Sequence, residues 1–281
     1  MTERMHIIGA GVMGCGIAEH LARLGHAVVL IDSQREARER ARARLSELTR
    51  LACFLGGERT DPDEVWARVK CTGDLGELRD ASFLLENVTE DRGIKRAVYA
   101  ECDSVCPADC VFISNTSAIP ITELGAMTGR PERVVGVHFM NPVARISTVE
   151  LIPGERTSAE TLARTQALLA RMGKRAVLLK DGAGFVSNRL LMSFVNEAAR
   201  LAEEGIASPA EIDVICRECF GHRMGPLETA DLIGLDTIAR TLEVLHGHFP
   251  GDRYRACERL MSAMRAGKWG RKSGEGFYEY E

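Results

Sequence analysis

The sequence lacks long apolar runs and has no large excess of charge of either sign. No stretch approaches the roughly 18–20 apolar residues that cross a membrane. The apolar residues 5–8 are too few for the core of a secretory signal, because Gly9 follows at once. The formal net charge is −4 and the pI is about 6.0, which gives no electrostatic reason to bind nucleic acid or an anionic membrane. We therefore expect a cytoplasmic protein that binds neither.

The cysteines give no sign of disulfides or of a metal site. There are nine of them, an odd number in a sequence without a secretory signal, which indicates reduced thiols. Cys216 and Cys219 form a lone CxxC, whereas a structural zinc site needs four ligands. We predict that the protein holds no metal.

Apolar runs alternate with helical stretches through the first two thirds of the chain. A length of 281 residues is enough for two domains of roughly 100–200 residues each. The runs with the composition of strands are residues 6–8, 27–31, 83–85, 111–114, 134–138, 149–152 and 176–179. A charged amphipathic helix is expected over 36–55, and its apolar face is predicted to hold Leu45, Leu48, Leu51, Ala52 and Leu55. This alternation predicts an α/β domain, a Rossmann-type doubly wound sheet with parallel strands.

The pattern changes after Asp181-Gly-Ala-Gly184. From residue 185 to about 266 the spacing is helical, with turn signals at Gly205, Ser208-Pro209 and Gly225-Pro226. We therefore predict a Rossmann-type domain over 1–182 and an all-helical C-terminal domain over 183–281. A helical domain of this size often completes its burial in a second subunit, so we expect a homodimer formed through it.

A GxGxxG motif follows the first predicted strand. It reads Gly9-Ala10-Gly11-Val12-Met13-Gly14, and an amphipathic helix comes after it. The first glycine permits a tight turn, the second lets the backbone approach a pyrophosphate, and the third allows close helix–strand packing. The helix N-terminus adds a positive dipole toward the phosphates. We therefore predict that residues 9–14, Val12 and Met13 included, bind a dinucleotide.

Asp32 bears on the choice between NAD and NADP. It ends the second predicted strand, 18 residues after Gly14. A carboxylate there accepts hydrogen bonds from the adenosine ribose and repels a 2′-phosphate. Arg35 favours NADP instead, since a nearby arginine can bind a 2′-phosphate. We predict NAD as the cofactor.

Polar side chains stand where later strands end. Ser117 follows the run 111–114, His138 ends the run 134–138, and Glu150 lies in the next run. Ligands of an open α/β sheet bind outside the carboxyl ends of its strands, and Pro142 can turn the chain so that Glu150 returns beside His138. Histidine suits the removal of a hydroxyl proton because its reference pKa is about 6.5, and a carboxylate behind it fixes the tautomer. His138 and Glu150 are thus candidates for a base and its partner, although a histidine at a strand end is often structural.

These motifs make the chain similar to one enzyme family over nearly its whole length. The sequence resembles the monofunctional 3-hydroxyacyl-CoA dehydrogenases, in particular their 3-hydroxybutyryl-CoA dehydrogenase branch. The matching motifs are residues 9–14 with Asp32, Glu86-Asn-Val-Thr-Glu90, Ser114-Asn-Thr-Ser117, His138-Phe-Met-Asn-Pro142, Val149-Glu150, Gly184-Phe-Val-Ser-Asn188-Arg189, Met224-Gly-Pro-Leu-Glu228, Asp231-Leu-Ile-Gly-Leu-Asp236 and Gly270-Arg-Lys-Ser-Gly-Glu-Gly-Phe277.

The resemblance implies an activity: NAD-dependent oxidation of a 3-hydroxyacyl thioester to the 3-oxoacyl thioester. It makes His138 the catalytic base and Glu150 its orienting partner. Ser117 would hydrogen-bond the reacting oxygen, and Asn188, at the start of the helical domain, would help to hold it. The family's helical domain is also its dimer interface.

Other residues gain expected roles from the same resemblance. Glu90 and Lys95 match positions that lie along the cofactor, and Asn115 matches one near the nicotinamide ribose. On the loop after His138, we expect Asn141 and Arg145 to bind substrate together with Ser117 and Asn188.

Three departures from the family pattern bear on the substrate. Asn87 stands where the family usually has alanine. Residues 144–148 read Ala-Arg-Ile-Ser-Thr in place of the usual Pro-Val-Met-Lys-Leu, which adds a cation at Arg145. Residues 51–57 read Leu-Ala-Cys-Phe-Leu-Gly-Gly, without the lysines that relatives often carry there, although Arg50 and Arg59 flank them.

Because these lysines are missing, the thioester substrate can be carried either by CoA or by an acyl carrier protein. Lys or Arg normally meets the phosphates of CoA, so this chain either binds CoA with other residues or takes its substrate from an acyl carrier protein. An apolar face suits docking of such a carrier. A glyceryl group on a carrier, as in polyketide extender-unit biosynthesis, would undergo the same chemistry, and Arg145 would then meet a polar or carboxylate group of the substrate.

Two other classes share part of the pattern. The β-hydroxyacid dehydrogenases use a lysine four residues before an asparagine, but Gly184 holds that place before Asn188. A non-catalytic NAD-binding protein of the crystallin type needs neither His138 nor Glu150, and the chain has both. We therefore prefer the interpretation as a 3-hydroxyacyl thioester dehydrogenase.

Overall fold

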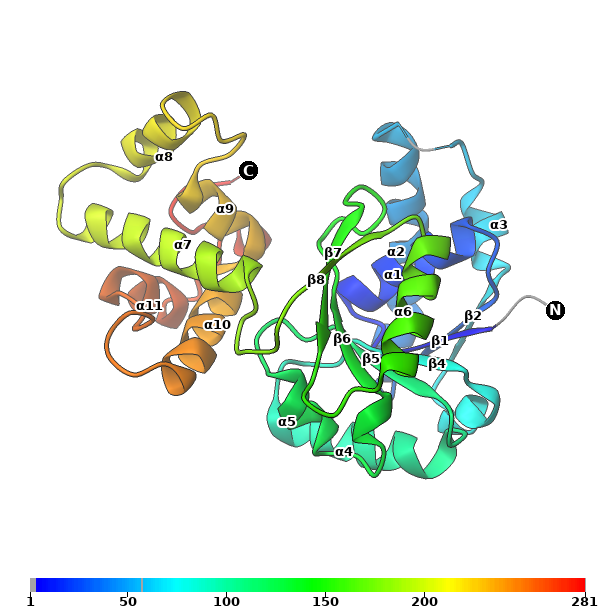
Figure 1. Ribbon diagram of the computed structural model, residues 1–281. Coiled ribbons are helices and arrows are strands. Elements are labelled where there is room, and N and C mark those ends of the chain that lie inside the picture. The colour runs from blue at the N-terminus through cyan, green and yellow to red at the C-terminus, as the bar shows by residue number, and fades with distance from the viewer. Residues whose placement is uncertain (1–3, 57, 281) are drawn as a thin grey trace. The chain divides into compact units, whose positions relative to one another are not determined.

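One sheet organises the N-terminal part of the chain (Figure 1). In the computed structural model, which describes residues 4–56 and 58–280, the strands are β1 (Met5–Ile8), β2 (Val28–Ile31), β3 (Val69–Thr72), β4 (Phe83–Glu86), β5 (Val111–Ser114), β6 (Val134–His138), β7 (Thr148–Pro153) and β8 (Arg175–Leu178). Their order in the sheet is β3-β2-β1-β4-β5-β6-β7-β8. The first six follow the Rossmann order, so the predicted fold class is confirmed.

Two details of the predicted sheet are wrong. β7 pairs antiparallel with β6, and β8 runs parallel to β7, so the sheet is not parallel throughout. A direct turn from β6 into β7 requires this, because a parallel partner would need a crossover connection. The edge strand β3 was not predicted, since Lys70 interrupts its short apolar pattern and three of its four residues keep exposed surface.

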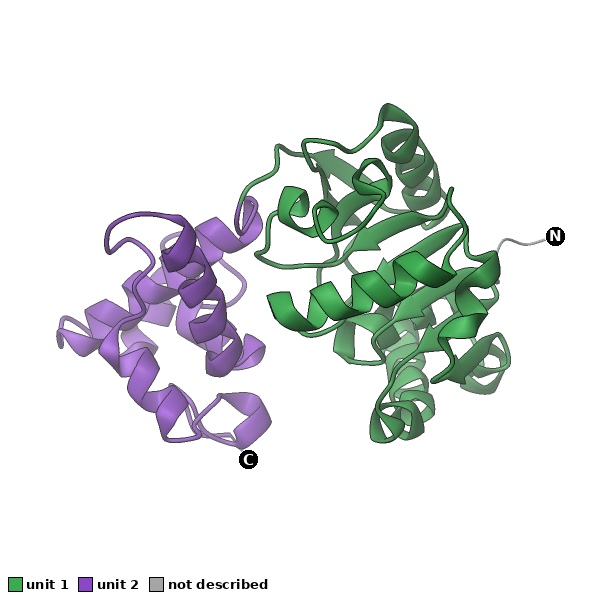
Figure 2. Ribbon diagram, turned by 90° about the horizontal axis from the view of Figure 1, so that it is seen from below, with its two compact units in different colours: residues 1–182 green, residues 183–281 purple. Residues whose placement is uncertain are grey.

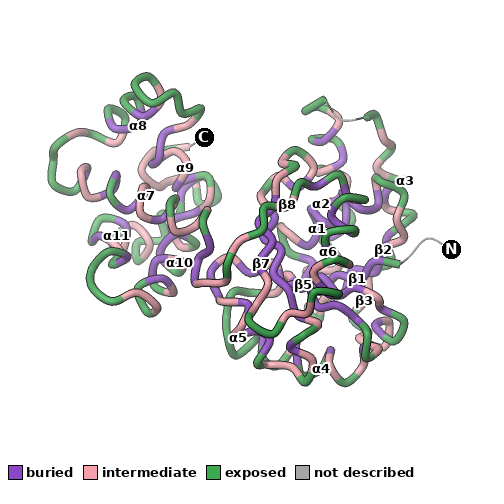
Figure 3. The backbone as a smooth tube through the Cα atoms, in the orientation of Figure 1, coloured by how far each residue is buried: buried purple, intermediate pink, exposed green. Residues whose placement is uncertain are grey.

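Helices cover both faces of the sheet. They are α1 (Val12–Arg23), α2 (Arg35–Phe54), α3 (Pro62–Trp66), α4 (Arg92–Val105), α5 (Ile121–Gly125) and α6 (Ala159–Arg171), with 3-10 turns η1 (Leu75–Asp80) and η2 (Pro131–Arg133). On one face, α1, α2, α3 and α6 share an apolar core with alternate strand residues such as Ile7 and Ile113. On the other face, Tyr99 of α4 packs on Phe112 of β5. The central strands β1, β2, β4, β5 and β6 are accordingly buried along their whole length (Figure 3).

The end of α2 differs from the expected apolar stripe. Leu45 and Ala52 are buried, as a core-facing helix requires. Leu51 and Leu55, however, keep 41% and 39% of their surface exposed, and Phe54 keeps 87%. The apolar stretch over 51–57 is therefore largely surface, apart from Gly57, which lies outside the described residues.

The second unit is helical. Its elements are α7 (Ser187–Glu203), α8 (Pro209–Glu218), α9 (Pro226–Ile233), α10 (Leu235–His248), α11 (Glu258–Arg265) and the 3-10 turn η3 (Arg271–Ser273). Ser208 and Glu211 form a capping box that starts α8. Asp231, buried in α9, accepts hydrogen bonds from the backbone of Phe277 and Tyr278 and so anchors the C-terminal segment.

The boundary between the two compact units lies between Gly182 and Ala183 (Figure 2). Just before it, Asp181 accepts hydrogen bonds from the backbone of Ile121 and Thr122 at the start of α5. The chain is therefore anchored to the first unit up to the boundary. No helix among the described residues is long and apolar enough to cross a membrane.

Candidate active site

The glycine loop has the geometry that a dinucleotide needs. Gly9 has φ +94°, and a Cβ there would lie 2.6 Å from the Asn87 carbonyl oxygen. A Cβ on Gly14 would lie 1.8 Å from the Gly9 carbonyl oxygen, so α1 can pack this closely only with glycine at that position. Gly11, the exposed N-cap of α1, has open space where its Cβ would be. The helix N-terminus can therefore approach phosphate oxygens directly.

Asp32 sits beside this loop at the end of β2. Its Oδ2 accepts a hydrogen bond of 2.7 Å from the Ala10 backbone N–H, and its Oδ1 accepts one of 2.8 Å from that of Gln34. The carboxylate is thus fixed next to the glycine loop, with further acceptor capacity on each oxygen. Arg35 is exposed and pairs with Glu39 at 2.6 Å. Val12 is also exposed and Met13 half-buried, on the open side of the loop.

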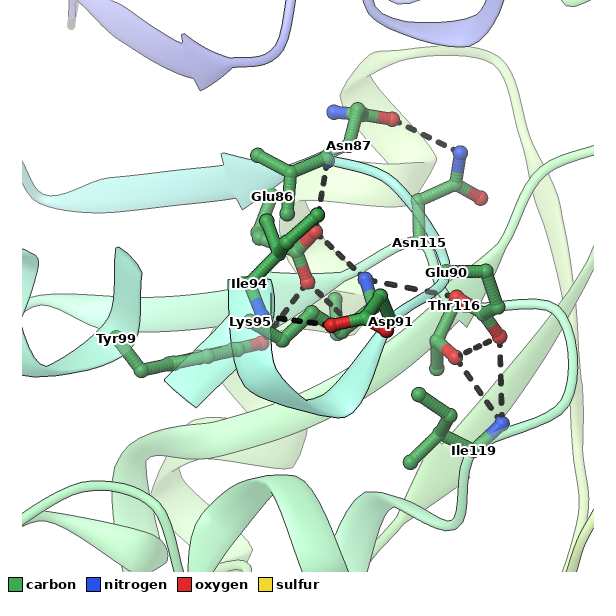
Figure 4. A network of polar contacts seen from close by, with 12 residues as sticks. Glu86, Asn87, Glu90, Asp91, Ile94, Lys95, Tyr99, Asn115, Thr116 and Ile119 are labelled. Atoms are coloured by element: carbon green, nitrogen blue, oxygen red, sulfur yellow. Dashed lines mark hydrogen bonds and ion pairs between the residues drawn. The ribbon is translucent and has the colours of Figure 1, made fainter. Parts of the chain in front are cut away.

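A buried carboxylate ties the ends of β4 and β5 together (Figure 4). Glu86 Oε1 accepts hydrogen bonds from Lys95 Nζ at 2.7 Å and from the Val88 backbone at 2.8 Å. Its Oε2 accepts from Ser114 Oγ at 2.8 Å and from Tyr99 OH at 3.2 Å. Burial and the Glu86 charge raise the pKa of Tyr99 well above its usual value, so this phenol stays a donor. A buried ion pair needs this number of partners to offset its desolvation.

Glu90 continues the network into the loop after β5. Its Oε1 accepts hydrogen bonds from Thr116 Oγ1 at 2.6 Å and from the backbone of Ser117 at 2.9 Å and Ala118 at 2.8 Å. Lys95 Nζ lies 3.5 Å from Glu90 Oε2. Lys95 is fully buried. Glu90 and Lys95 thus hold the loop that carries Ser117, and their expected place along the cofactor stays a prediction.

Asn115 is held from two sides. Its Nδ2 donates to Asn87 Oδ1 at 2.8 Å, and its Oδ1 accepts from the Phe139 backbone N–H at 2.9 Å. Phe139 follows His138 directly, so Asn115 joins the end of β5 to the end of β6. Both asparagines are half-buried at the carboxyl edge of the sheet.

His138 and Glu150 meet across the antiparallel pair β6–β7. The two residues are register partners, and His138 Nδ1 lies 2.8 Å from Glu150 Oε2. Both side chains are buried. The chain therefore returns at Pro142 as the sequence predicts, and it brings a carboxylate directly onto the imidazole.

The loop after β6 borders a pocket in the first unit. The cavity, of about 230 Å³, is lined by Gly16, Glu19, Arg23, Leu48, Leu51, Ala52, Leu55, Gly56, Pro142, Val143, Ala144 and Arg145. It brings together the apolar end of α2 and the altered loop, which are two of the departures from the family pattern. Arg23 pairs with the buried Glu19 at 3.2 Å, whereas Arg145, like Asn141, lies on the exposed side of its loop.

Lys174 holds the loop after β6 by hydrogen bonds to its backbone, a role that the sequence did not predict. Its buried ammonium donates to the backbone carbonyl of Val143 and, at 3.0 Å, to that of Ile146. Burial lowers the pKa of Lys174 to about 8, with a further lowering from Arg23 and a partial offset from Glu19. Lys174 therefore links the start of β8 to the loop that joins His138 to Glu150.

Glu86, the centre of the network, is a residue for which the sequence predicts no role beyond its place in a motif. A carboxylate that ends an apolar strand is nevertheless the signal of such a buried polar site. Asn188 lies in the first turn of α7, in the second unit. Among residues 4–56 and 58–280, no group of three or more His, Cys, Asp and Glu side chains could hold a metal ion.

The strand order and the glycine loop define a dinucleotide-dependent oxidoreductase of the Rossmann class. Comparison with known proteins narrows the class. Residues 4–182 match the family model described as 3-hydroxyacyl-CoA dehydrogenase, NAD binding domain, and residues 184–280 match the model of the C-terminal domain of the same family.

Similar proteins agree over their full length. A probable 3-hydroxybutyryl-CoA dehydrogenase of Bacillus subtilis is 42% identical over 282 residues, covering 99% of this chain and 98% of the relative. The crystal structure of M. tuberculosis FadB2 has a TM-score of 0.95 at 35% identity, covering 100% of this chain and 99% of that one. The (S)-3-hydroxybutyryl-CoA dehydrogenase PaaH1 of Ralstonia eutropha has a TM-score of 0.90 at 37% identity, with both chains fully covered. The chain belongs to the 3-hydroxyacyl-CoA dehydrogenase family, and its cofactor is NAD.

The lowered pKa of Lys174 predicts a pH-dependent contribution to stability. An unfolded lysine has a pKa near 10.4, so between pH 8 and 10 the unfolded chain binds more protons at this position than the folded chain. The free-energy cost of burying the charged Lys174 ammonium is therefore full below pH 8 and is lost as the pH rises from 8 to 10. We expect the free energy of unfolding of the wild type to gain on the order of 2 kcal/mol between pH 7 and pH 10 relative to Lys174→Met. Urea unfolding at several pH values measures this, and parallel pH profiles for the two proteins would contradict it.

Proposed function

We propose that this protein oxidises the 3-hydroxyl group of a 3-hydroxyacyl-CoA thioester to the 3-oxoacyl thioester, with 3-hydroxybutyryl-CoA as the first substrate to test. The observation that carries the proposal is the His138–Glu150 contact of 2.8 Å at the carboxyl edge of the sheet. The names of the Bacillus subtilis and Ralstonia eutropha relatives support the same substrate class.

His138 serves as the general base in this proposal. An ionised carboxylate can only accept a hydrogen bond, so the contact with Glu150 requires the imidazole proton on Nδ1. Nε2 then carries the lone pair that takes the hydroxyl proton. NAD, held by the glycine loop and Asp32, would supply the acceptor for the hydride that leaves the carbon bearing this hydroxyl. Glu150 stabilises the imidazolium that results and keeps the ring in one orientation.

Ser117 is the next residue that we assign to the substrate. The Ser117 backbone is fixed by Glu90, which sets the position of its hydroxyl at the end of β5. We assign this hydroxyl to the reacting oxygen, and the family resemblance implies that Asn188 is a further donor to it. Asn141 and Arg145, on the exposed loop after β6, are assigned to substrate binding.

The residues of the first unit fit NAD. Gly11 leaves room for the pyrophosphate at the N-terminus of α1, and Asp32 has acceptor capacity for the adenosine ribose. The orienting side chain Asn115 lies between the glycine loop and His138, where the nicotinamide ribose is expected.

We also propose a homodimer formed through the helical unit. Several large apolar side chains in this unit are at least half exposed, among them Leu190, Ile206 and Phe220. A second subunit that covers them would remove apolar surface from water.

A carrier protein is the second candidate source of the thioester. The observation in its favour is the exposed apolar end of α2, where Leu51, Phe54 and Leu55 lie beside or line the pocket. A phosphopantetheine arm brings no adenosine phosphates, so such a substrate does not need the lysines that this chain lacks. A glyceryl or similar polar acyl group would place an oxygen near Arg145.

Replacing Asp32 tests the cofactor site. In Asp32→Ala we expect the Kd for NAD to rise about tenfold to a hundredfold, because charged hydrogen bonds to the loop and the ribose are lost. Relative use of NADP should improve, since the repulsion of a 2′-phosphate is gone. Asp32→Asn, which keeps a carbonyl acceptor without the charge, should lose less NAD affinity. Titration of both variants with both cofactors provides the measurement, and unchanged affinities would show that Asp32 does not touch the adenosine.

Replacing His138 tests the mechanism. In His138→Gln we expect kcat to fall by roughly 10²–10⁴, the usual loss when a general base is removed, with little change in the Kd for NAD. Glu150→Gln should reduce kcat by less, because the base itself remains. Initial rates of NADH formation with saturating 3-hydroxybutyryl-CoA measure both. A rate like that of the wild type in His138→Gln would rule out the proposed mechanism.

Placing a lysine at Leu55 separates the two thioester carriers. We expect Leu55→Lys to raise kcat/KM for the CoA thioester by up to about tenfold if a phosphate is met, and to lower it for a carrier protein that packs on Leu55. Leu24→Lys, at the exposed end of α1 and outside the pocket lining, is the matched control. The carrier-protein candidate is wrong if two results are found together. Leu55→Lys would leave kcat/KM unchanged for both thioesters, and the wild type would use the CoA thioester with a kcat/KM of about 10⁴ M⁻¹s⁻¹ or better.

A further inference from the structure

Two asparagine side chains link the ends of β4, β5 and β6. Asn87 follows β4, Asn115 follows β5, and the strand residues before them, Glu86 and Ser114, are register partners. Asn87 Nδ2 donates to the Leu85 carbonyl at 3.2 Å. Its Oδ1 accepts from Asn115 Nδ2 at 2.8 Å, and Asn115 Oδ1 accepts from the Phe139 backbone at 2.9 Å. Figure 4 shows the central contact of this chain.

The two fixed backbone groups at its ends determine how both amides are oriented. The Leu85 carbonyl can only accept and the Phe139 N–H can only donate, so each asparagine between them must turn its amino group toward Leu85. Rotation of Asn115 by 180° would set its amino group against the Phe139 N–H. The Asn87 oxygen opposes this rotation because it accepts a hydrogen bond from the Asn115 amino group. An alanine at position 87 would remove that acceptor.

The chain of amides connects the cofactor loop with the catalytic strand. The Asn87 backbone N–H donates to the Ile8 carbonyl at 2.8 Å, and its carbonyl lies against Gly9, where a Cβ would come within 2.6 Å of it. At the other end, Phe139 adjoins His138. Glu150 therefore holds the imidazole from the β7 side, while Asn115 holds the adjoining backbone from the β5 side.

We propose that Asn87 is a positioning residue for the reaction: it orients the Asn115 amide and, through it, fixes the backbone beside His138 relative to the glycine loop. The proposal rests on the assignment of His138 as the base. Asn87 stands where the family usually has alanine. An alanine cannot accept the hydrogen bond from Asn115, so this contact distinguishes the present chain from relatives that carry alanine. A base held less firmly lowers the rate of the chemical step more than it weakens binding.

A double-mutant cycle tests whether Asn87 acts through Asn115. The variants are Asn87→Ala, Asn115→Ala and the double variant, assayed with 3-hydroxybutyryl-CoA and NAD. We expect Asn87→Ala to lower kcat about three- to tenfold, the effect of one lost hydrogen bond, with the Kd for NAD changed less than twofold. The double variant should be no slower than Asn115→Ala alone, because the two effects are coupled. Deuterium at C3 should give a larger isotope effect on kcat in Asn87→Ala than in the wild type.

Two further variants keep the test decisive. Thr89→Ala changes an exposed residue of the same loop and should leave kcat unchanged. Asn87→Gln keeps a carboxamide with both an acceptor and a donor and should have a kcat closer to that of the wild type than Asn87→Ala has. This comparison keeps the test decisive even if Asn87→Ala lowers the melting temperature. Additive effects in the cycle, or an unchanged kcat in Asn87→Ala, would overturn the proposal. An inactive wild type would instead refute the proposed function, so the two failures are distinguishable.

Discussion

The antiparallel return of β7 beside β6 is the constraint on which the candidate active site depends. The chain between β6 and β7 is too short for the crossover connection that a parallel neighbour needs, so β7 can pair with β6 only by running antiparallel to it. Because β7 runs back from the carboxyl edge of the sheet, Glu150 becomes the register partner of His138. Lys174 holds the loop between them by its backbone carbonyls. The proposed catalytic pair therefore lies on two paired strands that a supported loop connects.

A second set of contacts fixes the loops next to this pair. The buried Glu86 carboxylate satisfies donors from β4, α4 and β5, and Glu90 gathers the backbone of the loop that carries Ser117. Charged groups this deeply buried are costly when one partner is missing, so the network specifies one arrangement of the loops. The network thus holds the strand ends that would face NAD in one arrangement.

The sequence allowed the fold class to be predicted, because the GxGxxG context and the alternation of strands and helices are local patterns. Seven of the strands follow from apolar runs, whereas the edge strand β3 is too short and too polar to be recognised. The contact between His138 and Glu150 could be anticipated from the turn at Pro142. The burial of Lys95 and Lys174 could not be anticipated, since whether a lysine is buried against carboxylates or carbonyls depends on segments far apart in the chain. The exposure of Leu51 and Leu55 was likewise invisible to a helical repeat that placed them on the apolar face.

The most direct test of the central claim is the rate of NADH formation by the wild-type protein. One 3-hydroxybutyryl group would be offered on CoA, on an acyl carrier protein and on a pantetheine stub, each with deuterium at C3. We expect turnover at a kcat/KM of about 10⁴ M⁻¹s⁻¹ or better with CoA or the carrier protein, and transfer of the deuterium to the nicotinamide. Tight binding of NAD without oxidation of any of the three thioesters would contradict the account.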